Sequence, residues 1–289
     1  MRETEQAERA GLHAEEAELL IGLKRYPEAL AACSRAIAQD PEDAGNYFDL
    51  ARIHLLLEQD RDAQEAAQQA ITLAPEWPYG FYIMSVCLHR RLDFDGELRA
   101  AAHAVSLDPE NPLLLERLVR AQMQSGQLKK ARTTAAELVK VSPEDADTHS
   151  LLSDICFELS DYRCAETHLR EALRQTPENH VLHNDLGRIA LARKRWREAI
   201  DAFHHAVKLQ PDAATYHNNL NLAISYWLDS RGLGKMRSRA LDELPSEIRA
   251  FYQYRQARRT PFQRLGGFGP VLVIVILLLV LTYFFDAIR

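Results

Sequence analysis

The chain has 289 residues, of which 47% are hydrophobic and 26% are charged, a composition typical of folded proteins and not of disordered ones. Its net charge of −6 is uneven, because residues 231–264 contain nine Lys and Arg against three acidic residues. This leaves an acidic body in residues 1–230, which argues against nucleic acid as a partner, since phosphate binding needs clustered Lys and Arg.

The beginning of the chain and the cysteines bear on the compartment. Residues 1–9 are expected to form an N-terminal tail, and residues 1–20 lack an apolar stretch long enough for a secretory signal. The four cysteines show no regular spacing and lie inside apolar helical patterns, so we expect small core side chains and a reducing compartment. They are Cys33, Cys87, Cys156 and Cys164.

A proline recurs every 34 residues, six times without a gap. These prolines are Pro41, Pro75, Pro109, Pro143, Pro177 and Pro211. Small residues recur twelve and five positions before most of them, as in Ala63 and Ala70 or Ala199 and Ala206. Apolar residues at helical spacing, closed by turn signals such as Asp-Pro-Glu-Asp at 40–43, predict two helices in each unit.

This pattern resembles the tetratricopeptide-repeat (TPR) family, which combines Trp, Leu, Gly, Tyr, Ala, Phe, Ala and Pro in a 34-residue unit. The resemblance implies an all-α TPR superhelical solenoid of six repeats at 10–43, 44–77, 78–111, 112–145, 146–179 and 180–213. Residues 214–230 are expected to be a seventh first helix that caps the last repeat. The pattern is weak in repeat one, at His13 and Glu16, and it departs at Glu97 and Leu138, where small residues are expected.

The C-terminal part predicts a membrane anchor. Residues 268–285 contain no charge and would span roughly 27 Å as a helix, close to the bilayer core of about 30 Å. Residues 231–267 are expected to be a basic juxtamembrane linker and 286–289 a short tail. The arginines expected at the membrane surface are Arg249, Arg255, Arg258, Arg259 and Arg264. By the positive-inside rule they keep the repeats in the cytoplasm.

The segment that precedes the anchor allows two interpretations. Residues 246–259 form either a short surface helix or a solvated linker. In a surface helix, Ile248, Phe251 and Tyr252 would face lipid, and the arginines would contact headgroups.

Nothing in the sequence predicts catalysis or a cofactor. There is no phosphate-binding loop, no Cys-x-x-Cys motif and no serine in a nucleophile elbow. His149, His183 and His217 occupy the same position of successive repeats, about 10 Å apart by helix packing, which is too far for shared zinc ligands. They are interpreted as packing residues in place of the family's aromatic residue, and no metal site is predicted.

A second stripe on the first helices is left free by the packing stripe and predicts a concave groove that binds a partner. Aromatic residues and arginines held on rigid helices are typical of binding hot spots. The candidate groove residues are Phe48, Arg52, Leu55, Tyr79, Tyr82, Val86, Arg120 and Arg188. The arginines have a spacing that suits acidic groups on a partner segment. The alternative is that the aromatic rings pack against the neighbouring repeat or the N-terminal tail.

The predicted function is a scaffold or adaptor that binds a protein or peptide in its groove and recruits or assembles it at a membrane. The alternative is a permanent structural or assembly subunit of a membrane complex, which would have an apolar convex face. Some TPR domains clamp the carboxylates of chaperone tails with Lys and Asn, and the corresponding residues here do not reproduce that clamp. The Ala- and Arg-rich composition favours a bacterial inner membrane, although a eukaryotic outer mitochondrial or endoplasmic-reticulum location would need the same anchor.

Overall fold

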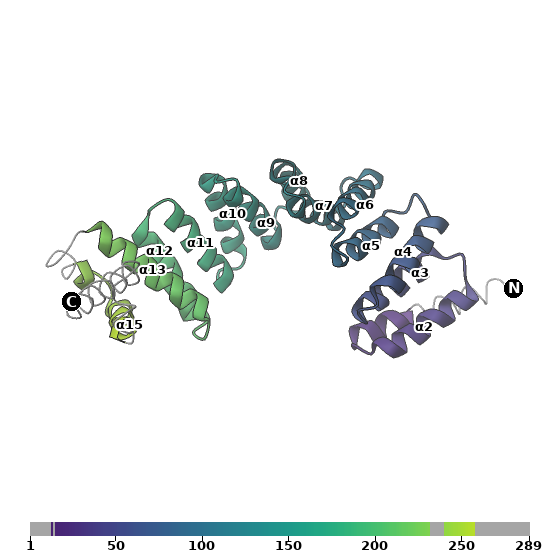
Figure 1. Ribbon diagram of the computed structural model, residues 1–289, viewed down its shortest axis with the longest axis horizontal. Coiled ribbons are helices and arrows are strands. Elements are labelled where there is room, and N and C mark those ends of the chain that lie inside the picture. Colours follow the sequence, from purple (N-terminus) through teal and green to yellow (C-terminus); the bar gives the residue numbers. More distant parts are fainter. Residues whose placement is uncertain (1–12, 14, 232–239, 258–289) are drawn as a thin grey trace, which may run out of the picture. The chain divides into compact units, whose positions relative to one another are not determined.

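The computed structural model describes residues 13, 15–231 and 240–257, and every regular element in these residues is a helix. The chain divides into two compact units, Met1–Pro177 and Glu178–Arg289. The helices of each unit are labelled in Figure 1. Within each unit the helices follow one another as antiparallel hairpins, which confirms the all-helical TPR solenoid expected from the repeat.

The first unit contains helical residues 15–22 and nine longer helices. These are α2 (Tyr26–Gln39), α3 (Ala44–Leu56), α4 (Asp60–Leu73), α5 (Pro78–Arg90), α6 (Phe94–Leu107), α7 (Pro112–Gln124), α8 (Leu128–Val141), α9 (Ala146–Glu158) and α10 (Tyr162–Gln175). Odd-numbered labels from α3 to α9 are the first helices of their repeats, and each packs on the even-numbered second helix that follows it.

Small residues hold the two helices of a repeat close together. Ala63, Ala67 and Ala70 on α4 are completely buried against α3 and α5, where a larger side chain would separate the backbones. First helices α3 and α7 begin at capping residues, since the Asp43 and Asn111 side chains accept hydrogen bonds from backbone N–H groups of the first turn, whereas α5 begins at Trp77 without a side-chain cap. Most repeats therefore specify both the start of a first helix and their internal packing.

The second unit contains α11 (His180–Ala192), α12 (Trp196–Leu209), α13 (Ala214–Ser230) and α15 (Ser246–Ala257), with helical residues also at 240–242. Its core joins Phe203 of α12 and Trp227 and Leu228 of α13 to side chains from beyond residue 239. Leu244 and Ile248 in that later segment are exposed by only 2% and 1%.

The helix at 214–230 packs on α12, and residues 240–252 in turn cover its apolar side. One expectation for this region is therefore corrected. Ile248 and Tyr252 do not face lipid, and Phe251 packs against the same cluster and stacks on His217 with ring centroids 5.1 Å apart. The apolar stripe of α15 is satisfied by protein because α13 presents a complementary apolar face beside it.

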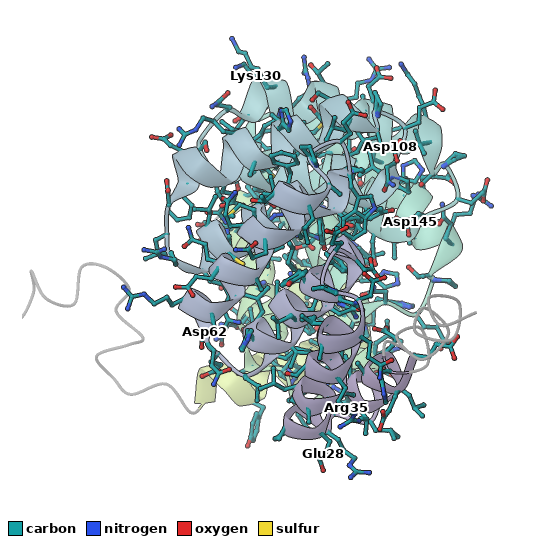
Figure 2. The ribbon with its side chains drawn as sticks, turned by 90° about the vertical axis from the view of Figure 1, so that its right-hand side faces the viewer. Glu28, Arg35, Asp62, Asp108, Lys130 and Asp145 are labelled. Atoms are coloured by element: carbon teal, nitrogen blue, oxygen red, sulfur yellow. A yellow bond between two sulfur atoms is a disulfide. The ribbon has the colours of Figure 1, made fainter. Side chains whose placement is uncertain are left out.

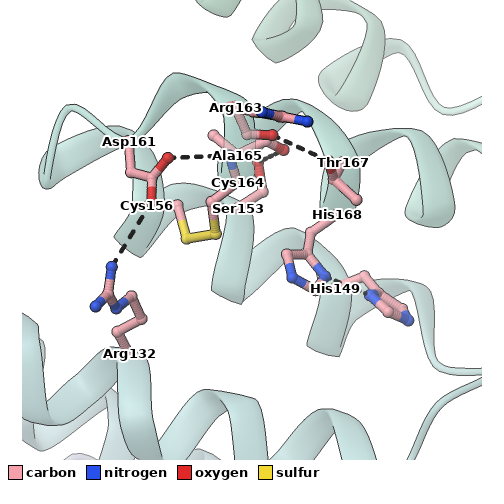
Figure 3. The surroundings of a disulfide bond; sticks show 10 residues. All are labelled: Arg132, His149, Ser153, Cys156, Asp161, Arg163, Cys164, Ala165, Thr167 and His168. Carbon is pink, nitrogen blue, oxygen red and sulfur yellow. Dashed lines mark hydrogen bonds and ion pairs between the residues drawn. A yellow bond between two sulfur atoms is a disulfide. The ribbon is translucent and has the colours of Figure 1, made fainter.

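Cys33, Cys87 and Cys156 are buried core side chains as expected, but two of the four cysteines are paired, which the expected reducing compartment does not favour. Cys33 and Cys87 are free and buried, and burial raises the pKa of these thiols to about 12 and about 11. Cys156 and Cys164 instead form a disulfide between α9 and α10 (Figure 3). The antiparallel hairpin brings these two positions together although they are eight residues apart in the sequence.

In residues 13, 15–231 and 240–257, no helix combines the length and the apolar character that crossing a bilayer requires. The anchor predicted at 268–285 lies outside the described residues, as do the N-terminal tail at 1–9 and the last four residues.

Candidate protein-binding surface

The predicted groove residues of the first unit come from the first helices α3, α5 and α7, and we call the surface formed by α3, α5, α7 and α9 the first-helix face. At one end of this face three rings make a cluster. The ring of Phe48 lies 5.6 Å from that of Trp77 and 6.1 Å from that of Tyr79, and the Trp77 and Tyr79 rings lie 5.5 Å apart. All three residues remain partly exposed. The cluster thus belongs to the packing between repeats and still offers ring surface to a partner.

Trp77 was not among the groove residues expected from the sequence. It precedes Pro78 in the turn before α5 and lies outside the helical stripe that defined the prediction. The nearby predicted groove residue Tyr79, at the start of α5, was the sequence signal that could have pointed to Trp77. The Tyr79 hydroxyl also accepts a hydrogen bond of 3.1 Å from Nδ2 of Asn111, the N-cap residue of α7, which fixes the position of the Tyr79 ring.

Arg52 is already engaged with carboxylates. Its guanidinium donates to Glu18 at 2.8 Å and to Asp49 at 3.0 Å, and it lies 5.6 Å from the centre of the Phe48 ring. Burial raises the pKa of Asp49, and the positive charge of Arg52 only partly offsets this effect. Arg52 therefore joins repeat one to repeat two, and its charge is largely neutralised within the chain.

The other predicted groove residues differ in how accessible they are. Leu55 is 9% exposed and belongs to the core, whereas Tyr82 and Val86 are partly buried and pack against that core. Burial raises the pKa of the Tyr82 hydroxyl. Tyr82 and Val86 consequently leave part of their surface on the first-helix face, and Leu55 leaves little.

The predicted arginine series is also paired internally. Arg120 donates to Glu116 at 2.7 Å, one turn earlier on α7. Arg188 lies in the second unit and donates to Asp185 at 2.9 Å. Each of these arginines thus has a carboxylate on its own helix, which reduces the positive charge that a partner would meet.

A buried ionic network lies between α5, α6 and α7. Glu97 is completely buried and accepts from Arg117 at 2.7 Å, while its other oxygen lies 2.9 Å from His89 Nδ1. Arg117 also donates to the hydroxyl and the backbone carbonyl of Ser85, at 2.9 and 2.8 Å. Burial lowers the pKa of Arg117, and the charge of Glu97 opposes this. Glu97 was expected as a departure from the repeat, but its partners became visible only in the structure.

The second helices α4 and α8 of the first unit have a mostly polar exposed surface. Large exposed apolar residues on its second helices are Leu73 and Val141, each the last residue of its helix. The remaining exposed positions of α4 and α8 are mostly charged or amide side chains. Asp62 on α4 and Lys130 on α8 project outward from the ribbon (Figure 2). Leu19, Leu56 and Leu113 are exposed on first helices, Leu56 as the last residue of α3.

The tetratricopeptide-repeat family model matches residues 20–85, 96–155 and 157–220, which is more than half of the chain. The chain belongs to the TPR family. The Protein STIP1 homolog of Dictyostelium discoideum is 26% identical over 135 residues, which is 47% of this chain. Those residues span 24% of that relative, so the likeness concerns about a quarter of its length.

Solved TPR structures share the fold at low sequence identity. The pilF protein of Pseudomonas aeruginosa is 14% identical, with a TM-score of 0.65, covering 74% of this chain and 97% of its own. The type IV pilus biogenesis factor PilW is 15% identical, with a TM-score of 0.66 and coverages of 74% and 98%. YrrB, a TPR protein with an unusual peptide-binding site, is 16% identical, with a TM-score of 0.56 and coverages of 65% and 96%.

The TPR histidines pack against other rings or bond to the backbone. His149 Nε2 lies 3.0 Å from the Pro143 carbonyl oxygen, so it donates there, and His149 Nδ1 lies 3.1 Å from His168 Nδ1. This geometry makes His149 Nδ1 the acceptor and His168 Nδ1 the donor when both rings are neutral. Burial, then the neighbouring His149, lowers the pKa of His168. The described residues contain no group of three or more metal-ligating side chains.

The arginines predicted at the membrane surface fall in and beyond α15. Arg249 donates to the Asp242 side chain at 3.1 Å and to backbone carbonyls of residues 242 and 244 at 3.3 Å, so it fastens α15 to the segment before it. Arg255 lies near the end of α15. Arg258, Arg259 and Arg264 lie outside the described residues.

Proposed function

We propose that this TPR protein is a membrane-anchored scaffold that binds a protein partner on its first-helix face and recruits or assembles it at a membrane. The observation that carries the proposal is the partly exposed ring cluster of Phe48, Trp77 and Tyr79 on the first-helix face. Aromatic side chains on rigid helices are frequent binding hot spots. The polar second helices favour an adaptor over a subunit buried on both faces.

The internal pairing of the arginines refines the partner's chemistry. Arg52 and Arg120 already have carboxylate partners, so a partner need not be acidic to bind here. The contribution expected from Phe48, Trp77, Tyr79 and Tyr82 is apolar and aromatic, with specificity supplied by the polar groups around them. A peptide or helix that carries one or two large apolar side chains suits this surface.

The anchor belongs to the proposal and is supported by the uncharged residues 268–285 and the basic residues before them. By the positive-inside rule we propose that the repeats lie in the cytoplasm at a bacterial inner membrane, although the Cys156–Cys164 disulfide is a bond that cytosolic proteins rarely keep. Because Arg249 is occupied by Asp242, headgroup binding is assigned to Arg255, Arg258, Arg259 and Arg264. A permanent subunit of a membrane complex remains the second candidate, carried by the same anchor.

Site-specific photocrosslinking in native membranes tests the choice of face. A photoreactive residue at Leu113, on the first-helix face, should crosslink to a partner, and one at Gln68, exposed on second helix α4, should not. Equal crosslinking at both sites would favour the permanent subunit. Crosslinking at Gln68 alone would show that the partner binds the opposite side.

A separate extraction experiment tests the anchor. The full chain should stay with membranes after an alkaline carbonate wash, and a chain that ends at residue 257 should be released. Retention of the shortened chain would show that attachment does not depend on residues 268–285.

A further inference from the structure

An apolar cleft of about 830 Å³ lies between second helices α6 and α8 and is also lined by first helix α7. Its apolar lining comes from Val105, Leu115, Leu118 and Val141, and its polar lining includes Glu110, Glu137 and Lys140. Sites for small organic ligands typically have volumes of roughly 300–1,000 Å³ and a mainly apolar lining with a few polar groups. The cleft is therefore of a size and kind that suits such a ligand.

The equivalent cleft one repeat earlier, between α4 and α6, is smaller, at about 490 Å³. There the Phe81 ring of α5 packs against His103 of α6, with centroids 4.2 Å apart. The positions that correspond to this ring pair, 34 residues later, are Leu115 and Glu137. The larger cleft arises because repeat four has no ring pair at these two positions.

Repeat four is exceptional in this respect. Its first helix has Leu115 where the other repeats and α13 have a ring, namely His13, Tyr47, Phe81, His149, His183 and His217. In the second unit, His183 repeats the arrangement of Phe81 and lies 4.2 Å from His205 between ring centroids. Leu138, the larger side chain of α8 noted from the sequence, is buried in the core and does not line the cleft. In the other repeats an aromatic or histidine ring occupies the position of Leu115, and the space beside Leu115 corresponds to that ring.

The charges around the cleft favour a cation. Glu137 is paired with Lys140 at 2.8 Å, whereas Glu110 forms no ion pair with any residue in the described part of the chain. One carboxylate is therefore left over beside the apolar lining. A ligand with an ammonium group would meet an uncompensated negative charge there, and a carboxylate ligand would be repelled.

We propose that the cleft between α6 and α8 binds a small aromatic amine. The aromatic ring occupies the place of the missing ring pair, against Leu115 and Leu118, and the ammonium group lies beside Glu110. This site is independent of partner binding on the first-helix face, so either assignment can fail without the other.

Saturation-transfer NMR on the full chain in nanodiscs of zwitterionic lipid tests the proposal, with phenethylamine as the probe and phenylacetate as the probe of opposite charge. Phenethylamine should bind at millimolar or lower concentration, with phenylacetate at least about tenfold weaker. Leu115→Phe fills the cleft and should weaken phenethylamine binding at least about tenfold. Leu73→Phe makes the same change at an exposed position of second helix α4 outside the lining and should leave binding unchanged.

A second variant keeps the test decisive if Leu115→Phe does not fold. Glu110→Gln with Glu137→Gln preserves shape and should remove most of the preference for phenethylamine over phenylacetate. Absence of phenethylamine binding, or unchanged binding in both the folded Leu115→Phe variant and the glutamine variant, would overturn the site. If phenethylamine does not bind but Leu115→Phe weakens capture of a protein, the cleft receives a protein side chain and the amine assignment is wrong.

Discussion

The docking of α15 on α13 leads to the sharpest prediction about stability. Ile248 is 1% exposed and packs in a cluster with Trp227, Leu228 and Tyr252. Truncating a buried Ile to Ala typically costs about 2–5 kcal/mol, because transfer free energy is lost and a cavity remains. Elements at the end of a repeat array can open without unfolding the rest. We therefore expect Ile248→Ala to raise the open population of α15 by roughly 30-fold or more, at about 1.4 kcal/mol per factor of ten.

Hydrogen exchange measured by mass spectrometry provides the assay. In Ile248→Ala, amides of α15 and of α13 should exchange faster, while those of α3 to α9 in the first unit should be unchanged. Gln253→Ala, at an exposed position of the same helix, is the matched control and should change stability by no more than about 0.5 kcal/mol. If both variants exchange alike, α15 is not docked as described. If Ile248→Ala instead weakens binding of the full chain to lipid vesicles and leaves amide exchange unchanged, then Ile248 faces lipid and not the α13 cluster.

Three further predictions concern the polar and covalent features of the repeats. Glu97→Ala leaves Arg117, whose side chain is 13% exposed, without its carboxylate, and should destabilise the chain by about 3–5 kcal/mol in urea unfolding. The double variant Glu97→Ala with Arg117→Met should recover most of that loss. Equal destabilisation in the single and the double variant would contradict the network. The pKa of His168 is lowered in the folded state, so at a pH below the ordinary histidine pKa of about 6.5 the unfolded chain binds more protons than the folded chain. The contribution of His168 to folding stability is therefore complete above that pH and should fall as the pH is lowered through it. His168→Gln should flatten this dependence, apart from the part due to His204, whose pKa is also lowered by burial, and an unchanged slope would refute the assignment. Reduction of the Cys156–Cys164 disulfide should lower unfolding stability by about 2.5 kcal/mol, the chain-entropy value for a loop of this length, and Cys164→Ser should make stability insensitive to reductant.

The sequence by itself determined the repeat architecture of this protein, because each 34-residue unit carries local instructions that do not depend on distant residues. Pro75 ends one unit, Asp43 caps a first helix, and Ala63 and Ala70 require close helix contact wherever they stand. The sequence also predicts the first-helix stripe that contains Phe48 and Tyr82, because the helical period fixes which residues share a helix face. It does not predict how exposed each residue of that stripe is, because exposure depends on how closely neighbouring repeats pack over residues such as Leu55.

Only the tertiary structure showed which residues contact the apolar stripe of α15, the Glu97 carboxylate and the two cysteines of the disulfide. The apolar stripe of α15 suits a lipid surface and a protein core equally well, and only the packing of Ile248 and Tyr252 against the α13 cluster selected the core. Glu97 and Arg117 are twenty residues apart, and their pairing depends on the approach of α6 to α7. Cys156 and Cys164 meet because a hairpin reverses the chain between them. Local sequence specifies the helices, their faces and the packing within a repeat, whereas the partners of residues that depart from the repeat depend on distances between elements that the repeat pattern does not encode.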